Sequence, residues 1–400
     1  MKRNDQMTVH VYRNGTFVTE TIICDAAVAA AFVAFPSTEF YMLPGFADVH
    51  VHLREPGFSY KETVRTGTLA AAHGGYTAVC SMPNLAPVPH GLDALRVQLD
   101  AIERDAVVLV KPFGSITVGE EGKALSDMEA LAPYVCGYSD DGRGVADGGM
   151  MKEAMQRAKA LGHVIAAHCE DMKYAPDDPK SEWSEVERDI LLAKDTGAAL
   201  HICHVSSRIS VELIRQAKKD GIDVTAETAP HYLLLDRSMR RDAGNWKMNP
   251  PLRDKEDREA LLCAIADGTI DTVATDHAPH SAEEKSRGYE KSLNGIVGLE
   301  CAFPVLYTGL VETGILTLQA LIARISAAPR KRFGLGGVDP TPTEHTLWTL
   351  GGPKYGIDVN TFLSMGRSTP FEGYGVNAHC IYTEFGGRKA WTSPVITTER

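Results

Sequence analysis

The feature that most constrains the fold is an alternation, repeated eight times, between short apolar runs and segments with helical spacing. Many of the runs are rich in β-branched residues, as strands are. Eight strand-then-helix units are the number that a closed (β/α)8 barrel requires. We therefore predict an α/β fold of the TIM-barrel type. The candidate strands are residues 45–52, 76–83, 106–114, 134–141, 163–171, 198–206, 222–231 and 270–280.

Two segments between the candidate strands carry recognisable helix ends. Residues 61–75 close on a glycine pair, and glycine commonly follows a helix because it adopts left-handed backbone angles. Residues 207–221 contain Ser210 as a candidate N-cap and finish at Gly221. An open, doubly wound sheet is the competing architecture. It usually has a glycine-rich phosphate loop after its first strand, and this sequence has none there.

The two ends of the chain differ from this middle part. Residues 1–44 contain short alternating segments, and one of them, "MTVHVYRNG", is typical of a hairpin. Glycine and proline become dense after residue 335, and short apolar runs follow. We predict that residues 1–44 and 336–400 together form one small β-rich subdomain beside a barrel of residues 45–335.

Composition and charge argue against two classes of partner. The formal net charge is −11 and no basic run with interleaved aromatic residues occurs, so nucleic-acid binding is not expected. The N-terminus lacks the apolar core of a signal peptide, and no apolar run is long enough to span a membrane. The eight cysteines form no C-x-x-C pair, as is usual in a reducing compartment. We expect a soluble, cytoplasmic protein.

The first candidate strand runs into "DVHVHLREPG", which sets His50 and His52 two residues apart. Successive side chains of a strand point to opposite faces, so both imidazoles share a face, while Val49 and Val51 pack behind them. Such a pair is either half of a metal-ligand set or two packed polar residues. The ends of the other strands favour the metal.

Four other strand ends carry imidazole or carboxylate side chains. Barrel active sites form at the carboxyl ends of the strands, so these groups would share one rim with the histidine pair. A mixture of imidazole and carboxylate ligands suits Zn²⁺ or a similar divalent ion. The groups are Asp140 and Asp141 after the fourth strand, His168 after the fifth, His204 after the sixth and Asp276 after the eighth.

Strand alternation narrows this set. His201 and His204 are three residues apart and so face opposite sides of a regular strand. We choose His204 because it is nearer the rim, and we leave His201 to the helix-packed side. Asp140 and Asp141 cannot both point inward either, and their spacing leaves open which of them does.

A cluster of this size can hold two ions that share a carboxylate. A divalent ion lowers the pKa of bound water from about 15.7 toward 7 and so supplies a nucleophile at neutral pH. Asp276 would then be both a ligand and the acid/base group that carries a proton to a leaving nitrogen. These residues indicate hydrolysis, or its reversal, at a carbonyl centre.

Eight motifs between residues 44 and 335 resemble, in the correct order, those of the dihydroorotases of the long bacterial type, in the amidohydrolase superfamily. The resemblance implies the reversible cyclisation of N-carbamoyl-L-aspartate to L-dihydroorotate in pyrimidine biosynthesis. The histidine pair alone would indicate only the superfamily. The motifs are "GFADVHVHLREPG", "GGYTAVCSMPN", "SDDG", "AHCED", "HICHVS", "KMNPPLR", "ATDHAPH" and "GIVGLE".

The resemblance also implies a ligand set for one or two Zn²⁺ ions. In related enzymes such as dihydropyrimidinase a carbamylated lysine joins the two ions. Lys111 is the rival for that role here, but we interpret it as structural because the fourth strand already supplies a carboxylate. The implied set is His50, His52 and Asp276 for one ion, His168 and His204 for the second, and Asp141 between them.

The implied small-molecule substrate carries a carboxylate, and Arg54 offers a planar guanidinium that binds carboxylates through two hydrogen bonds. An ion pair with Glu55 is the alternative role for this arginine. The charged residues 281–293 are our candidate for a lid. The resemblance places Arg54, Asn84, Asn249 and His280 around the substrate, with Asn294 and Gly295 closing over its ring.

The sequence departs from relatives at Tyr232, where a second histidine is usual, and at Asn294, where an aromatic residue is usual. Every ligand position is filled, so we predict an active enzyme rather than an inactive scaffold that partners aspartate transcarbamoylase. Another cyclic amidase (dihydropyrimidinase, hydantoinase or allantoinase) is the second alternative, but those enzymes lack an arginine like Arg54. A homodimer and a complex with aspartate transcarbamoylase both stay open.

Overall fold

The computed structural model describes residues 6–23, 26–35 and 38–394. Its central part is a parallel barrel whose strands run in the order β4-β5-β6 and β7-β8-β9-β10-β11-β12. Apart from Ser115, one residue beyond the predicted segment 106–114, these strands fall inside the eight segments predicted from the sequence, so the predicted fold class is confirmed. They are β4 (Phe46–Val51), β5 (Tyr76–Ser81), β6 (Leu109–Pro112), β7 (Gly114–Ser115), β8 (Gly137–Ser139), β9 (Val164–Ala167), β10 (Ala199–Ile202), β11 (Val224–Thr228) and β12 (Thr272–Val273).

The cylinder of strands is completed at two places, where the two sheets meet. The strands β6 and β7 lie on either side of Phe113 and act as one interrupted strand. At the other seam, Val51 of β4 pairs with His277, which follows β12. The His52 N–H also donates a hydrogen bond of 2.8 Å to the carbonyl oxygen of His277. This seam brings the histidine pair of the first strand beside Asp276 of the last.

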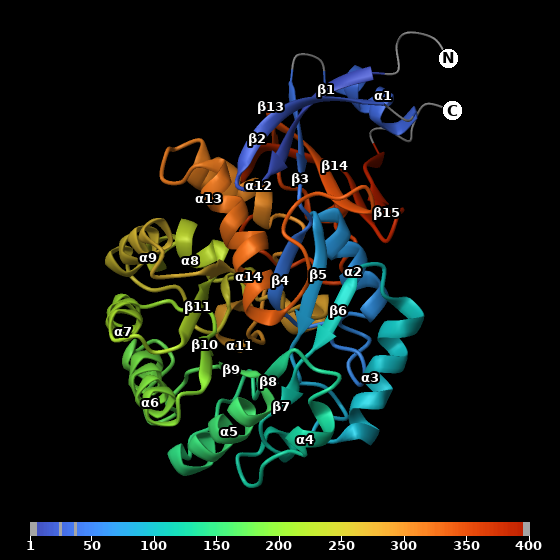
Figure 1. Ribbon diagram of the computed structural model, residues 1–400. Coiled ribbons are helices and arrows are strands. Elements are labelled where there is room, and N and C mark those ends of the chain that lie inside the picture. The colour runs from blue at the N-terminus through green and yellow to red at the C-terminus, as the bar shows by residue number, and fades with distance from the viewer. Residues whose placement is uncertain (1–5, 24–25, 36–37, 395–400) are drawn as a thin grey trace.

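Helices surround the barrel strands (Figure 1). The helix predicted within residues 61–75 is α2, which begins after a Thr63 cap and is followed by Gly74. The cap of α7 is Ser207 and not Ser210 as predicted, because Ser207 Oγ accepts the Ser210 N–H at 3.3 Å. The helices after the first barrel strand are α2 (Val64–His73), α3 (Leu92–Asp105), α4 (Met128–Leu131), α5 (Gly148–Leu161), α6 (Lys180–Thr196), α7 (Arg208–Lys219), α8 (Pro230–Leu234), α9 (Lys255–Asp267), α10 (Ala282–Lys285), α11 (Gly288–Lys291), α12 (Ala302–Leu306), α13 (Leu318–Ile322) and α14 (Ala328–Phe333).

Both chain ends contribute to a second sheet, which lies at one end of the molecule beside the barrel (Figure 1). The predicted hairpin is present as β1 and β2, and a helix, α1 (Ala26–Ala34), which was not predicted, follows them. The sheet agrees with the predicted β-rich part, whereas the exact division at residues 44/45 and 335/336 stays a prediction. In order across the sheet, the strands are β15 (Arg388–Thr392), β14 (Gly375–Phe385), β13 (Glu344–Gly356), β3 (Glu39–Leu43), β1 (Gln6–Arg13) and β2 (Thr16–Ile23).

The barrel interior is filled by small and aromatic side chains. Alternate strand residues such as Ala47, Cys80 and Ala166 pack together with Phe113, and Phe333 from the end of α14 packs edge-on against Phe113. A larger apolar cluster lies between the strands and the helices. This division of the core identifies, for each strand residue, whether its side chain faces inward or toward the helices.

The described part of the chain holds seven cysteines, all of them free thiols, and six of these are buried. Cys263 is the exposed one, and Cys24 lies outside the described residues. In the same part of the chain, the structure has no helix with both the length and the apolar character that crossing a membrane requires.

Candidate active site

A β-bulge in β4 aims the histidine pair into the barrel. The pairing of β4 with β5 shifts register between Asp48 and Val51. Buried Asp48 supports the irregular segment, because its carboxylate accepts the backbone N–H of His50 at 3.0 Å and that of Thr275 at 3.0 Å. The prediction that Val49 and Val51 both pack behind the imidazoles was wrong. Val49 joins the interior cluster and Val51 the outer one, since a bulge reverses the alternation of faces.

His204 reaches the site through a left-handed backbone and not by strand alternation. Ala199 and Cys203 of the same segment pack in the barrel interior, and His201 shares their face. His201 therefore lies inside the barrel, against Phe333, and the prediction that it faces the helices was wrong. The positive φ of His204, 35°, turns its side chain inward despite its odd spacing.

The two aspartates after β8 separate as strand geometry requires. Asp140 accepts the N–H groups of Ile116 (2.7 Å) and Thr117 (3.0 Å) and also the Thr117 hydroxyl, so it holds the neighbouring loop. Asp141 points instead toward the histidines of the barrel rim. The choice that the sequence left open is thus decided in favour of Asp141.

The predicted ligand atoms meet in one cluster around Asp141. Tetrahedral coordination with bonds of about 2.0–2.2 Å would separate neighbouring ligand atoms by about 3.3–3.6 Å. Asp141 Oδ1 lies 3.2 Å from His50 Nε2, 3.4 Å from His168 Nδ1 and 3.6 Å from His204 Nε2, and Asp141 Oδ2 lies 3.4 Å from His52 Nε2. This spacing fits a carboxylate that bridges two ions.

Asp276 completes one half of this cluster. Its Oδ1 lies 3.1 Å from His52 Nε2 and 3.6 Å from His50 Nε2. Two buried polar atoms, His50 Nε2 and Asp141 Oδ1, have no hydrogen-bond partner in the described part of the chain. Burial opposes ionisation of Asp141, but His50 and the other imidazoles hold the pKa of this carboxyl well below its usual range. The donor set therefore suits a divalent cation.

Each of three imidazoles is oriented by a polar partner on its other nitrogen. The Nδ1–H of His50 donates to Glu227 at 2.6 Å, and the Nε2–H of His168 donates to Glu170 at 3.1 Å. His52 differs, because its Nδ1–H donates to the amide oxygen of Asn84 at 2.9 Å. Such partners fix the ring and leave the opposite nitrogen unprotonated for a metal ion.

Glu227 and Glu170 were missed by the sequence analysis. Both stand at or just after the end of a barrel strand, within "AETAPH" and "AHCED", so their position at the rim was available as a signal. Glu227, however, bonds to histidines on other strands, and Glu170 bonds to His168, two residues before it. His50, His201 and other groups lower the pKa of Glu227 although its burial favours the neutral form.

The cluster forms the floor of a cavity of about 200 Å³. All six residues that the sequence places around the substrate line it, together with five of the six predicted metal ligands. His50, the sixth ligand, is fully buried beneath it. The lining residues are His52, Arg54, Asn84, Asp141, Gly142, His168, His204, Asn249, Asp276, Ala278, His280, Asn294 and Gly295.

Arg54 is a buried cation on the wall of this cavity. Its backbone is left-handed, with φ of 60°, and its Nε–H donates to the carbonyl oxygen of Pro279 at 3.2 Å. Burial lowers its pKa to about 10, so the group stays charged at neutral pH. The alternative pairing with Glu55 is wrong, because Glu55 instead accepts the Val64 N–H and contacts Arg104.

His280 on the same wall is neutral. Burial and the adjacent cations Arg54 and Lys61 lower its pKa to about 3. The tautomer follows from its partners, because Nε2–H donates to the Asn294 carbonyl at 2.7 Å while Nδ1 accepts from Lys61 at 3.2 Å. Lys61, which the sequence analysis did not single out, thus holds one wall of the cavity.

The candidate lid, residues 281–293, is anchored beside the cavity by a buried lysine. The Lys285 ammonium donates to the carbonyl oxygens of Gly295 at 2.6 Å, Leu293 at 2.8 Å and Lys247 at 3.1 Å. These bonds hold the backbone next to Asn294. Movement of this segment as a lid stays a prediction.

Comparisons with known proteins agree with the site. A sequence family described as Dihydro-orotase-like matches residues 40–179. The dihydroorotase of Fusobacterium nucleatum is 44% identical over 371 residues, covering 88% of this chain and 87% of that protein. The dihydroorotase of Bacillus anthracis is 45% identical over 370 residues, covering 87% and 86%.

Solved structures with the same fold include two hydantoinases. L-Hydantoinase (dihydropyrimidinase) from Arthrobacter aurescens has a TM-score of 0.81 at 23% identity and covers 95% of this chain and 93% of its own. D-Hydantoinase (dihydropyrimidinase) from a Thermus species has a TM-score of 0.77 at 22% identity, covering 96% and 92%. At this identity the likeness shows the fold alone. The far closer sequence relatives decide the family, and the chain belongs to the dihydroorotases.

Proposed function

We propose that this chain is a zinc-dependent dihydroorotase, which interconverts N-carbamoyl-L-aspartate and L-dihydroorotate in pyrimidine biosynthesis. One observation carries the proposal: the buried guanidinium of Arg54 faces the same 200 Å³ cavity as the cluster of imidazoles and carboxylates. A cyclic amide that bears a carboxylate has both of the groups that such a cavity would bind.

We assign the metal ligands as one shared carboxylate between two halves. His50, His52 and Asp276 would hold one Zn²⁺, His168 and His204 a second, and Asp141 both. When bound, zinc would supply a hydroxide at neutral pH and polarise the amide carbonyl. Donor spacings of 3.1–3.6 Å around Asp141 and Asp276 support this set, whereas the two imidazole nitrogens of the second site, His168 Nδ1 and His204 Nε2, lie closer together at 2.8 Å.

We assign proton transfer to Asp276. In the hydrolytic direction the water gives one proton to solvent as hydroxide forms, and the Asp276 carboxylate takes the second proton and delivers it to the ring amide nitrogen as the C–N bond breaks. The carbonyl carbon gains the oxygen and becomes the free carboxylate of N-carbamoyl-L-aspartate. In the cyclising direction the nitrogen returns its proton through Asp276 to the departing oxygen, which takes a second proton from solvent and leaves as water. Asp276 lines the cavity, as this role needs.

Substrate recognition follows from the hydrogen-bonding groups that remain on the cavity wall. We assign the ring carboxylate to the Arg54 fork. Asn84 uses its amide oxygen for His52, which leaves its NH₂ group to donate to the substrate. Asn249 uses its NH₂ group for Glu170, which leaves its oxygen to accept. Gly295, with φ of 130°, lines the cavity beside Asn294 and His280, and a side chain at this position would collide with Ala278.

A hydantoinase or dihydropyrimidinase activity is the second candidate, because those proteins share the fold. Two features of this chain disfavour it. The position that joins the two halves of the cluster holds the Asp141 carboxylate, while Lys111 is exposed on its strand. The cavity also contains Arg54, for which a substrate without a carboxylate has no use.

The test is an ultraviolet assay of dihydroorotate hydrolysis by the purified, zinc-loaded chain, run in parallel with dihydrouracil and hydantoin. We expect turnover of dihydroorotate, no turnover of the other two, and loss of activity with Asp276→Asn. Turnover of dihydrouracil but not of dihydroorotate would transfer the assignment to the second candidate. A zinc-loaded chain that acts on none of them would indicate a scaffold subunit.

Location in the cytoplasm and assembly as a homodimer or with aspartate transcarbamoylase are further proposals that follow from the family. Light scattering of the purified chain, alone and mixed with aspartate transcarbamoylase, tests both assemblies. A mass of 43.4 kDa for the chain alone would contradict the homodimer. A mixture in which the two proteins keep their separate masses would contradict the complex.

A further inference from the structure

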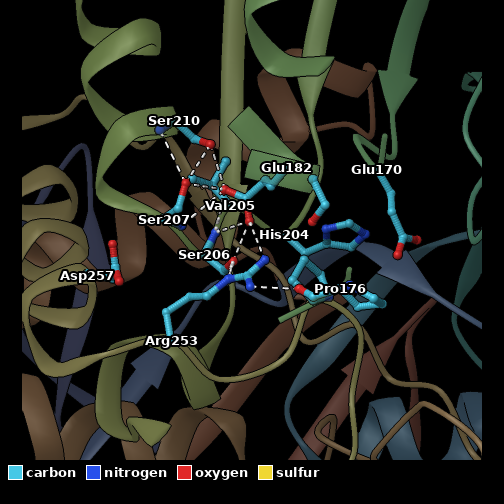
Figure 2. Close-up of polar contacts among 12 residues, drawn as sticks. Glu170, Pro176, Glu182, His204, Val205, Ser206, Ser207, Ser210, Arg253 and Asp257 are labelled. Atoms are coloured by element: carbon cyan, nitrogen blue, oxygen red, sulfur yellow. Dashed lines mark hydrogen bonds and ion pairs between the residues drawn. The ribbon is translucent and has the colours of Figure 1, made fainter. Parts of the chain in front are cut away.

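A buried carboxylate lies directly behind the loop that carries His204. Glu182 of α6 is only 3% exposed and does not line the cavity. Figure 2 shows its carboxylate facing the serines at the start of α7. It accepts the N–H groups of Ser206 (3.2 Å) and Ser207 (3.0 Å), and the hydroxyls of Ser206, Ser207 (3.0 Å) and Ser210 (2.6 Å).

These contacts place an anion at the N-terminus of a neighbouring helix. Ser207 is the N-cap of α7, and the N–H groups at a helix start lack partners within the helix. The Glu182 carboxylate accepts the N–H groups of the cap residue Ser207 and of Ser206, and its charge is favoured there by the helix dipole. Ser206 and Ser207 stand two and three residues after His204, so Glu182 fixes the backbone that leaves the metal ligand.

A second carboxylate holds the same backbone from the other side. Glu227 Oε1 lies 3.3 Å from the His204 N–H, and the Glu227 carbonyl accepts the Val205 N–H at 2.8 Å. His204 has a left-handed φ of 35°, which costs free energy in a residue other than glycine. Such a conformation persists only where its surroundings impose it, and here Glu227 and Glu182 are those surroundings.

Arg253 joins this loop to the substrate side of the cavity. It is 4% exposed, donates from Nε to Ser206 Oγ at 3.0 Å and from Nη1 to the Pro176 carbonyl at 2.8 Å, and its Nη2 lies 3.9 Å from Glu182. Figure 2 shows it on the side of the serines opposite α7. Arg253 follows the cavity residue Asn249 by four positions.

The contacts of Asn249, His168, His204 and Arg253 link these residues in a ring. Asn249 donates to Glu170 at 2.9 Å, and Glu170 accepts from His168. His168 Nδ1 and His204 Nε2, the two nitrogens that would face the metal ion, lie 2.8 Å apart, and the loop after His204 returns to Arg253 through Ser206. Two proposed ligands and one proposed substrate-binding residue are therefore parts of a single buried polar network.

We propose that Glu182 and Arg253 are positioning residues that hold His204 in its metal-binding orientation and couple it to the loop of Asn249. This inference deepens the proposed function and rests on it for the identity of the metal and substrate. Neither residue lines the cavity, so each acts through another side chain. Partners of this kind typically change metal affinity or activity by 10–100-fold when they are replaced.

Metal binding, rather than activity, is the primary test. Apoprotein would be titrated with Co²⁺, whose visible absorption reports coordination, and the affinity and stoichiometry would be measured by calorimetry. Glu182→Gln keeps the size of the side chain but removes its charge and presents an NH₂ group to N–H donors. We expect about a 10–100-fold loss of affinity for one class of bound Co²⁺, with unchanged far-ultraviolet circular dichroism.

Two further variants sharpen the result. Glu187→Gln is the matched control, because Glu187 lies on the exposed face of the same helix, and it should bind Co²⁺ as the wild type does. Ser210→Ala removes one donor to Glu182, and we expect a smaller loss in the same direction. It also keeps the proposal testable if Glu182→Gln does not fold. Wild-type affinity and absorption in both Glu182→Gln and Ser210→Ala would overturn the role of Glu182.

Arg253 is tested by the coupling that it is proposed to provide. Arg253→Met should raise KM for dihydroorotate and weaken Co²⁺ binding together, each on the order of 10-fold, and Arg253→Lys should restore part of both. A change in only one of the two would show that the loops are not coupled. If the wild type binds Co²⁺ but does not hydrolyse dihydroorotate, the proposed function fails, and the Co²⁺ titrations still decide the role of Glu182.

Discussion

The two halves of the metal-binding cluster are held in different ways. His50 and His52 lie on or directly after a barrel strand, and the backbone pairing of Val51 and His52 with His277 connects them to Asp276. His168 and His204 lie just beyond the strand ends, where His168 donates to the loop residue Glu170 and the backbone N–H of His204 donates to Glu227 of β11. We call these the sheet half and the loop half of the cluster.

The difference teaches which half can respond to substrate. In a sheet, main-chain hydrogen bonds set side-chain direction, and substitutions nearby alter it little. The loop half lacks this strand pairing, and its His168 is oriented by Glu170, which also binds the cavity residue Asn249. The sheet half has a comparable link to the cavity, because His52 donates to Asn84. We infer that the backbone of the sheet half is the more rigid base, whereas the geometry of the loop half depends more on neighbouring side chains.

Asp141 is the one residue that both halves share, so its removal should have the largest effect. Asp141→Ala would leave His50, His168 and His204 without their common carboxylate. We expect loss of metal from both halves and activity near background, measured by atomic absorption on the dialysed protein and by the ultraviolet assay. Full metal content in this variant would show that the halves are independent.

Asp276→Asn tests chemistry within the sheet half. The amide keeps the shape of the side chain but cannot carry the proton, and general acid–base catalysis contributes about 10²–10⁴-fold. We expect kcat to fall by that factor while KM changes little, from initial rates over a range of dihydroorotate concentrations. An unchanged kcat would remove Asp276 from the mechanism.

Arg54→Gln separates substrate binding from metal binding. Arg54 follows the sheet half, and it touches no predicted ligand of the loop half in the described part of the structure. Loss of a charge-assisted pair costs about 1.5–3 kcal/mol, so we expect KM to rise by about 10–100-fold. Metal content should be unchanged, in contrast to Arg253→Met. A parallel loss of metal would erase the distinction between the two halves.

Graded removal of metal should separate the halves directly. Because His168 and His204 lie outside the strands, we expect their ion to leave at a lower chelator concentration than the ion held by His50 and His52. Titration of the Co²⁺-loaded protein with a chelator, followed by visible absorption, should show two steps. In Glu182→Gln the first step should shift to a still lower concentration, and a single step in the wild type would count against the comparison.

The smallest expected effect concerns His280, which lies on the cavity wall outside both halves of the cluster. Its pKa in the folded protein is about 3, below the 6.5 of the unfolded chain. Between these values the unfolded state binds more protons, so the free energy of unfolding falls as the pH drops, by up to about 1.4 kcal/mol per unit from this group. His280→Gln should reduce that slope, measured by urea unfolding of both metal-free proteins at pH 4–6. Equal slopes would contradict a buried neutral imidazole.

The success of sequence-based prediction differed along the strands. His168 and Asp276 were chosen because they end their strands, and both follow interior residues of those strands, Ala166 and Ala274, by two positions. The alternation rule placed His201 wrongly, because it assumes a regular strand and His204 has a left-handed φ. The cap of α7 was placed three residues too late for a related reason: several serines stand near the helix start, and contacts with Glu182 are not visible in the spacing.

By itself, the sequence determined the order of eight strands and helices, the chemical types of the ligands, and the end of the barrel where they gather. These follow from local patterns, because hydrophobic periodicity and parallel strands act over a few residues at a time. Only the tertiary structure decided that Asp141 rather than Asp140 turns inward, and that Glu227, Glu182 and Arg253 support the imidazoles. The physical reason is that a bulge or a left-handed residue changes the face of a side chain. Such features are stabilised by hydrogen bonds from segments more than twenty residues away.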